Sequence, residues 1–196
     1  MAVGKKEVKK GRGILSKRCL ILFRGSFNTN PAMKHILPIL TITTLAAAAS
    51  AQSASGLSYN RVSLGYASSN SLNGYSLGAS ALIGGSNFLV SASTTIGGDV
   101  GNGSDSVSLG YVFKNVALGA DATVSVGSNE SYGIDLRKDL GSNLEASAEI
   151  GRVSGSTVWG VELAYNVSKQ IQVAVGYTDS ADFVDSVTSF AVRYNF

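Results

Sequence analysis

The sequence predicts an all-β fold, namely a transmembrane up-and-down antiparallel meander β-barrel of ten strands, preceded by a signal peptide. Apolar and polar residues alternate with period 2 from Val62 nearly to the C-terminus, which is typical of strands with one apolar and one polar face. The apolar face carries no charge in the strand centres, and the charged residues of these segments gather on the polar face. Eight strands are the alternative, if two weak hairpins merge.

The N-terminal part of the chain is predicted to be removed from the mature protein. Residues 1–32 carry eight Lys or Arg and a single acid, and we interpret them as a start codon assigned too early or a long n-region. A nucleic-acid-binding arm is the alternative for such a basic segment, but it would be lost on cleavage. Residues 33–51 have the order of a secretory signal peptide, with Lys34 and His35, an apolar run, and a small-x-small cleavage site that ends at Ala51. The apolar run is shorter than the ~20 residues with which a helix crosses a bilayer.

The mature chain, residues 52–196, is predicted to be acidic. Seven Lys and Arg remain in it against twelve Asp and Glu, so its formal net charge is −5 although the whole chain carries +3. We therefore expect no nucleic acid as a partner. It contains neither Cys nor His, and His is the usual acid or base near neutral pH. We therefore expect that the protein is not an enzyme and that it binds no cofactor.

Short turns are expected at one end of the barrel and longer loops at the other, separated by strands such as the alternating run from Val116 to Val126. Clusters of Gly, Asn, Ser and Asp mark both kinds of connection. The short turns are predicted at residues 84–87, 114–115, 139–143 and 168–170, and the longer loops at 68–74, 97–104, 127–131, 153–156 and 179–185.

The polar face cannot form a packed core, because buried charges are costly unless they are paired and its other residues are mostly Gly, Ser, Thr and Ala. The economical arrangement places the apolar face in lipid and the polar face around the lumen. The charged residues predicted to line the lumen are Arg61, Asp121, Asp135, Arg137, Glu145, Glu149, Glu162 and Arg193.

The aromatic residues of the apolar face fall into two groups once both termini are placed in the periplasm. Two such belts are expected where a barrel meets the two membrane interfaces. The upper girdle is predicted to contain Tyr66, Tyr75, Tyr132, Trp159 and Tyr177, and the lower one Phe88, Tyr111, Phe113, Tyr165 and Tyr194. Tyr59 is out of phase with Val62, so the first strand is expected to start later or to carry a bulge.

Two interpretations of the lumen charges remain open. They could form an internal salt-bridge network that fills a closed barrel, or they could line a narrow pore that mildly favours cations. Ten strands at ~4.8 Å spacing and ~40° tilt give a backbone radius of ~10 Å, which leaves room for either arrangement.

The longer loops are acidic, and this suggests two weaker hypotheses. Asp179, Asp182 and Asp185 are weak candidates for a calcium site, because carboxylates suit Ca²⁺. They lack a known ligand spacing, so a solvated acidic rim is the expectation and no metal site is predicted. The loops could also act on lipopolysaccharide, divalent cations or host ligands.

The chain ends with Phe190, Val192, Tyr194 and Phe196 in alternation, which looks like the C-terminal assembly signal of outer-membrane barrels. The mature chain resembles the small porin-like, OmpA/OmpX-type barrel proteins of Gram-negative bacteria along its whole length. It departs from their eight-stranded members in its ten apparent strands and its shorter upper loops.

The resemblance implies a monomer in the outer membrane, surrounded by lipid and lipopolysaccharide, with both ends of the mature chain in the periplasm. It also implies periplasmic chaperones and the barrel assembly machinery as partners during biogenesis. The expected function is a narrow pore for small solutes or a structural role in the membrane. A surface protein that acts through its acidic loops is the alternative.

Overall fold

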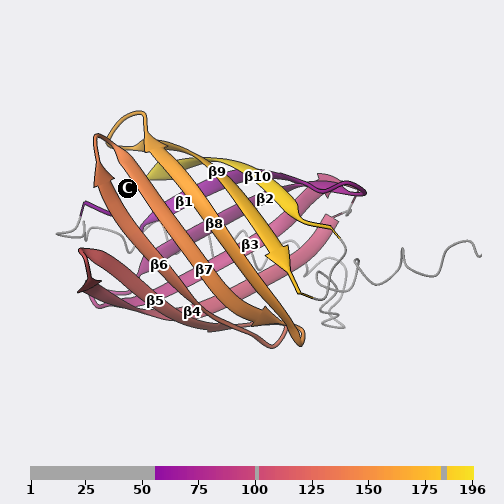
Figure 1. Ribbon diagram of the computed structural model, residues 1–196, viewed down its shortest axis with the longest axis horizontal. Coiled ribbons are helices and arrows are strands. Elements are labelled where there is room, and N and C mark those ends of the chain that lie inside the picture. Colours follow the sequence, from indigo (N-terminus) through magenta and orange to yellow (C-terminus); the bar gives the residue numbers. More distant parts are fainter. Residues whose placement is uncertain (1–55, 100–101, 182–184) are drawn as a thin grey trace, which may run out of the picture.

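The computed structural model describes residues 56–99, 102–181 and 185–196, which form a closed antiparallel barrel (Figure 1). Its strands follow one another in sequence order around the barrel, so the predicted up-and-down meander of ten strands is confirmed. They are β1 (Arg61–Ser68), β2 (Asn73–Leu82), β3 (Phe88–Gly98), β4 (Asn102–Ala117), β5 (Ala120–Gly127), β6 (Ser131–Gly141), β7 (Leu144–Val153), β8 (Ser156–Asn166), β9 (Ile171–Ser180) and β10 (Val187–Asn195). Within the described ranges there is no helix long and apolar enough to cross a membrane.

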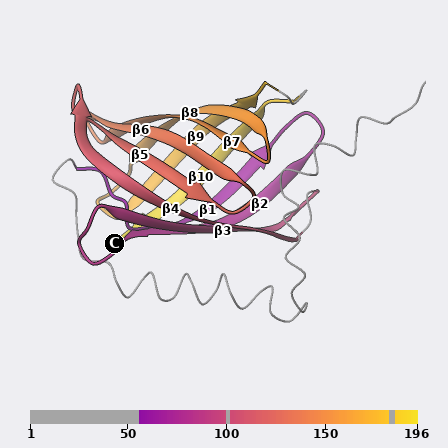
Figure 2. The same ribbon diagram turned by 90° about the horizontal axis from the view of Figure 1, so that it is seen from below.

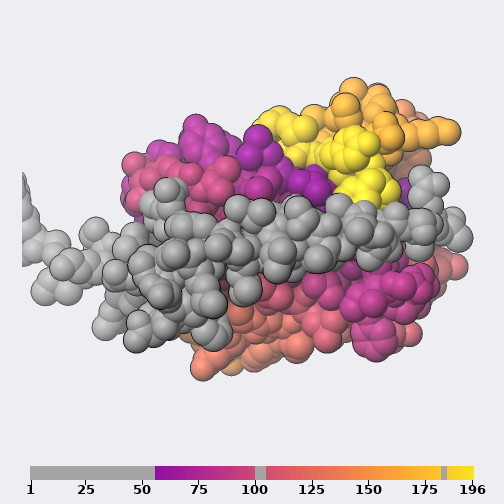
Figure 3. All heavy atoms as spheres, turned by 180° about the vertical axis from the view of Figure 1, so that it is seen from behind, coloured from indigo at the N-terminus to yellow at the C-terminus, as the bar shows by residue number. Residues whose placement is uncertain are grey.

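The barrel closes where β1 pairs with β10. The register runs without a shift from Arg61 opposite Asn195 to Ser68 opposite Thr188. Figure 3 shows the C-terminal strand in yellow directly beside the indigo first strand. Closure removes both sheet edges, so the backbone groups of β1 and β10 find partners on both sides.

Three connections are two-residue hairpin turns with a positive φ at both central residues, which is the type I′ conformation. They are Leu118–Gly119 between β4 and β5, Ser142–Asn143 between β6 and β7, and Ser154–Gly155 between β7 and β8. This turn matches the twist of the flanking strands. Asn and Gly adopt it at little cost, whereas Leu118 at φ 52° is a strained choice.

The turn predicted at residues 114–115 was placed wrongly. β4 continues to Ala117, and the chain reverses at Leu118 and Gly119. The register shifts between Phe113 and Ala117, and Asn115 has a φ of 55°, so the Asn marks an irregularity inside the strand rather than its end. Leu118, expected on the outer face of the next strand, lies at the tip of the turn with 90% of its surface exposed.

The barrel is apolar outside and polar inside. Large aliphatic side chains on its outer surface are about half exposed, for example Val126 at 59% and Ile150 at 58%. The charged side chains of Asp121 and Arg137 are 1% and 4% exposed. Burial is thus the reverse of that in a water-soluble barrel, and it follows the predicted orientation of the two faces.

Both described chain ends lie at the same end of the barrel (Figure 2). We call this the terminal end; it also holds the turns after β2, β4, β6 and β8. The other end, which we call the loop end, holds the turns after β1, β3, β5, β7 and β9. The predicted division into short turns and longer loops was wrong: the connections at the terminal end have two to five residues and those at the loop end two to six, and the loop predicted at residues 153–156 is a two-residue turn. Leu57, Tyr59, Leu82 and Val112 form a small buried apolar cluster, and Leu89 packs against it. The cluster lies toward the terminal end.

The seam between β1 and β10 gives a direct test of closure. Leu64 and Val192 face one another across it, and paired antiparallel residues are ~4.5–5.5 Å apart between Cα atoms, within the range of a disulfide. We expect cysteines at these two positions to form a disulfide on oxidation, in a chain whose Cys19 is replaced by Ser. The band shift on a non-reducing gel measures it.

The matched control places the second cysteine at Val175, which lies on β9 and is separated from β1 by β10. Cross-linking of this control to the same extent would contradict the observed seam.

Candidate functional site: the barrel lumen

The charged residues predicted to line the lumen come together on the inner face of the barrel. β6 and β7 contribute two each, Asp135 with Arg137 and Glu145 with Glu149, because residues two apart on a strand share a face. The others come from β1, β5, β8 and β10 and are Arg61, Asp121, Glu162 and Arg193. Their position is observed, whereas a role in conduction stays a prediction.

The first ion pair joins β8 to β10. Arg193 donates from Nη1 to Glu162 Oε1 at 2.7 Å and from Nη2 to Oε2 at 2.5 Å, which is the two-pronged geometry that a guanidinium and a carboxylate prefer. Arg193 Nη1 also donates to Gln172 Oε1 at 3.1 Å. Gln172 on β9 is 2% exposed and links this pair to the next one.

The second ion pair joins β6 to β7 and is more deeply buried. Arg137 Nη2 and Nε lie 2.6 Å and 2.7 Å from Glu145 Oε1, and both side chains are 5% exposed. Gln172 Nε2 donates to Glu145 Oε2 at 3.0 Å and to Asn166 Oδ1 at 3.0 Å. A continuous chain of hydrogen bonds therefore runs from Glu162 through both arginines across β8, β10, β9, β7 and β6.

The segment before β1 completes this chain at the terminal end. Arg137 Nη2 donates to the Ser58 carbonyl at 3.1 Å, and its guanidinium carbon lies 4.6 Å from the centre of the Tyr59 ring. Tyr59 is 2% exposed and donates its hydroxyl to Asp121 Oδ2 at 2.9 Å. Burial raises the pKa of Tyr59, so the phenol stays protonated and remains a donor.

Asn60 fixes the same segment to the wall, because its Oδ1 accepts a hydrogen bond from the Leu82 amide at 2.9 Å. Ser80 Oγ donates to the Tyr59 carbonyl at 2.8 Å. Residues 56–60 thus fold inward and narrow the lumen at the terminal end. We call residues 56–60 the N-terminal plug.

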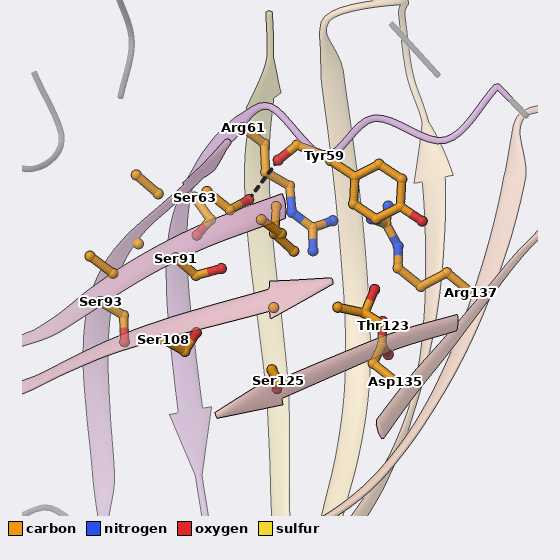
Figure 4. Close-up of a pocket in the computed structure, with 16 residues that line it drawn as sticks. Tyr59, Arg61, Ser63, Ser91, Ser93, Ser108, Thr123, Ser125, Asp135 and Arg137 are labelled. Atoms are coloured by element: carbon orange, nitrogen blue, oxygen red, sulfur yellow. Dashed lines mark hydrogen bonds between the residues drawn. The ribbon is translucent and has the colours of Figure 1, made fainter. Parts of the chain in front are cut away.

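Two cavities remain in the lumen. The first, of about 280 Å³, is lined on the β1–β5 side by hydroxyl groups and glycine (Figure 4). The second, of about 230 Å³, is lined on the β6–β10 side by charged groups. Arg61, Asp135 and Arg137 border both cavities, so these three residues lie where one cavity meets the other.

Three lumen charges stand outside the network. Within the part of the chain that the structure describes, Arg61, Asp135 and Glu149 make no ion pair, and Arg61 Nη1 is a buried donor without an acceptor. Asp135 and Glu149 are opposite one another on β6 and β7. The two interpretations left open by the sequence therefore apply to different parts of the lumen: a network at five charges, and unpaired groups beside cavities at three.

The predicted girdle residues lie on the outer surface near the two ends. Those toward the terminal end include the contacting rings of Phe88, Tyr111 and Phe113, and those toward the loop end include the neighbouring pairs Tyr66–Tyr75 and Trp159–Tyr177. Tyr132, Tyr165 and Tyr194 are exposed as well. Their contact with membrane interfaces stays a prediction.

The predicted assembly signal is the outer face of β10. Phe190, Val192 and Tyr194 are exposed there, and the amide of Phe196 donates to the Asn60 carbonyl at 3.1 Å. The C-terminal residue thus meets the N-terminal plug. A role in assembly stays a prediction.

Three acidic groups of the loop end accept hydrogen bonds from neighbouring residues of that end, and two of these bonds join different hairpins. Asp185 accepts from Ser71 Oγ at 2.7 Å, and Asp99 accepts from the Asn73 side chain. Asp179 accepts from the Ser180 amide at 2.7 Å. Asp182 lies outside the described residues, and the described ranges contain no group of His, Cys, Asp and Glu side chains arranged for a metal ion.

The neutral members of the site were not predicted from the sequence; they are Gln172, Asn166, Ser58 and Asn60. Gln172 could have been found, because it is the largest residue on the inward face of β9, which otherwise holds Ala174, Gly176, Thr178 and Ser180. Tyr59 is out of phase with Val62 because the chain there is not yet part of β1, and its side chain lies inside the barrel.

No family model matches the chain, and no curated protein matches it. Several solved structures that are similar to it are porins or outer-membrane proteins. A structure of the KdgM porin has a TM-score of 0.46 and 13% identity, and the match covers 69% of this chain and 99% of that one. The NanC porin has a TM-score of 0.42 and 14% identity, covering 70% and 98%. The Yersinia pestis protein Ail in a nanodisc has a TM-score of 0.38 and 13% identity, covering 71% and 100%.

The buried ion pair predicts a difference between two glutamates of the same strand. We expect Glu145→Gln to lower the free energy of unfolding by about 3–5 kcal/mol, because it leaves the buried Arg137 guanidinium without its counter-charge. We expect Glu149→Gln to leave stability unchanged or to raise it, because Glu149 faces Asp135 and like charges opposite one another repel. Urea unfolding of the barrel in lipid vesicles measures both, and equal losses would contradict the assignment of the pair.

Proposed function

We propose that the mature chain is an outer-membrane barrel of a Gram-negative bacterium whose lumen gives small solutes a narrow path, restricted at the terminal end by the N-terminal plug and the ion-pair network. The observation that carries the proposal is the reversed burial of the barrel. Exposed aliphatic residues surround a lumen that holds charged groups and two cavities. In an outer membrane the apolar outer face would contact lipid and the polar lumen would contact water.

Closure supports a membrane position independently. In hydrocarbon no water is present to hydrogen-bond a free backbone group, so a β-structure can cross a bilayer only as a closed barrel. The barrel closes through an unbroken register between β1 and β10. The N-terminal residues 33–51 supply the export signal in this proposal, and residues 1–32 are not part of the working protein.

The proposed orientation places the terminal end in the periplasm and the loop end at the cell surface. The C-terminal strand, with Phe190, Val192, Tyr194 and Phe196, is then available to the barrel assembly machinery during insertion, after periplasmic chaperones have carried the chain. Lipopolysaccharide surrounds the outer half. One copy of the barrel is sufficient for the lumen path, so the proposed working form is a monomer, and no catalytic step is assigned to it.

The alternative, a surface protein that acts through acidic loops, is less well supported. Asp185 and Asp99 are engaged with Ser71 and Asn73 of the same end. These carboxylates stabilise loop conformation and are less available to an external ligand.

A charge on the outer surface tests the membrane position. We expect Val124→Arg to destabilise the folded barrel in lipid vesicles by about 2–4 kcal/mol, because an arginine is then forced into hydrocarbon. Val124 is 45% exposed, so a barrel surrounded by water would accept the same change at little cost. Ser154→Arg in the turn between β7 and β8 is the control. Equal stability of both variants would contradict the membrane position.

Single-channel recording tests the path through the lumen. We expect the purified, folded protein to give small discrete conductance steps in planar bilayers. Tyr59→Ala should enlarge them, because it removes the ring that packs beside Arg137 and the hydroxyl held by Asp121. Tyr132→Ala, which removes a ring from the outer surface, is the matched control and should leave the steps unchanged. The complete absence of conductance from both the unsubstituted protein and the Tyr59 variant would refute the pore.

A further inference from the structure

The lumen holds three charged groups that the ion-pair network does not use. Arg61 on β1, Asp135 on β6 and Glu149 on β7 form no ion pair among the described residues, although each borders a cavity. Glu149 is exposed to the lumen, and Arg61 and Asp135 are half-buried with the Arg61 Nη1 atom fully buried; a charge withdrawn from water is costly unless it is paired. Their retention beside cavities points to a ligand that supplies the missing charges.

The two carboxylates call for a cation. Asp135 and Glu149 are directly opposite one another on neighbouring strands, and like charges in that arrangement destabilise a sheet. Both line the cavity of about 230 Å³, with Gly160 beside Glu149. An ammonium or guanidinium group placed between the two carboxylates would relieve their repulsion and donate charge-assisted hydrogen bonds to both, since carboxylate oxygens accept and the cation donates.

The arginine calls for an anion. The other two lumen arginines are each neutralised by a glutamate, Arg137 by Glu145 and Arg193 by Glu162. Arg61 has no such partner among the described residues, and its Nη1 is buried without an acceptor. Figure 4 shows the Arg61 guanidinium pointing into the lumen near Arg137. A carboxylate is the anion whose geometry a guanidinium fits best.

The three groups together define the complement of one class of solute. They offer one positive and two negative charges, so the matching ligand has one carboxylate and two cationic groups. We propose that Arg61, Asp135 and Glu149 form a binding site for a basic α-amino acid, with the ligand carboxylate on Arg61 and its cationic groups on Asp135 and Glu149. This proposal rests on the proposed solute path and names the class of solute that uses it.

The dimensions favour a ligand of that size. Arg61 and Asp135 border both cavities, so a solute between them can extend into either one. Each cavity is smaller than the ~300–1,000 Å³ of pockets for drug-sized ligands. The hydroxyl groups of Ser63, Ser91 and Thr123 around the first cavity can hydrogen-bond a polar solute without fixing its charge.

Equilibrium dialysis of the folded protein in detergent tests the site with four probes: radiolabelled lysine, lysinamide, norleucine and glutamate. We expect lysine to bind best. Lysinamide lacks the carboxylate and norleucine lacks the side-chain ammonium, so each should bind about tenfold more weakly, as expected when one charge-assisted contact is lost. Glutamate, with its extra negative charge, should bind least.

Two variants test which side chains produce the preference for lysine over the other probes. Arg61→Gln should weaken lysine binding and remove the preference for lysine over lysinamide. The double variant Asp135→Asn, Glu149→Gln should remove the preference for lysine over norleucine. Glu130→Gln, which removes one negative charge from the turn between β5 and β6, is the control and should change neither preference. Heat-modifiable gel mobility checks that each variant is folded.

Equal binding of the four probes to the unsubstituted protein, or no binding, would overturn the site even if the variants fail to fold. Planar-bilayer recording on the same preparation separates this failure from failure of the pore. Salt conductance without lysine binding overturns the site and leaves the pore standing. Selective lysine binding without conductance supports the site and overturns the pore.

Discussion

The need of every backbone amide and carbonyl for a partner constrains this structure more than any other interaction. A row of strands always leaves two unpaired edges unless its first and last members meet, and here β1 and β10 meet in an unbroken register from Arg61 to Ser68. Once the edges are gone, the outer surface is free to be apolar, because no backbone group is left there to require water. The exposed valines, leucines and isoleucines of the outer face are therefore a consequence of closure as well as of the alternating sequence. The same alternation turns every polar residue inward, so closure also creates the lumen.

The charged side chains of the lumen fall into two groups, those that form ion pairs and those that do not. Arg137 and Glu145 neutralise one another, as do Arg193 and Glu162, and the neutral side chain of Gln172 joins the pairs through one amide oxygen and one amide nitrogen. Such a connected network satisfies most of its own donors and acceptors, which stabilises one arrangement of the wall. Asp135 and Glu149 differ from these pairs, because they are opposite one another and neither makes an ion pair among the described residues. Residues that break the local rules for stability are expected where a protein works, and this contrast is the reason for placing function at the unpaired groups rather than at the pairs.

The sequence was sufficient for the fold and for the membership of the lumen, because both follow from a period of 2 that needs no long-range information. The sequence was not sufficient to predict which side chains of the lumen contact one another. Glu162 meets Arg193 across β9 and Tyr59 meets Asp121 across 62 positions of sequence, and these contacts depend on strand stagger and on the path of the N-terminal plug. The misplaced turn at residues 114–115 has a similar cause. Asn favours positive φ both in a turn and in a bulge, so Asn115 gave the same local signal for either, and the pairing of Ala117 with Ala120 decided between them.

The two halves of the barrel wall contribute differently to the proposed solute path. On the β1–β5 side, small hydroxyl residues and glycine leave an open cavity and offer hydrogen bonds without charge. On the β6–β10 side, arginine and carboxylate side chains reach across the remaining space and hold the polar network. A wall of charged residues on both sides would fill a lumen of this width, and a wall of hydroxyl groups on both sides would have no means to distinguish one solute from another. Arg61 lies on β1, on the side lined by hydroxyl groups, but its side chain is charged like those of the β6–β10 side. It borders both cavities, which is where the proposed binding site requires a group that selects the solute.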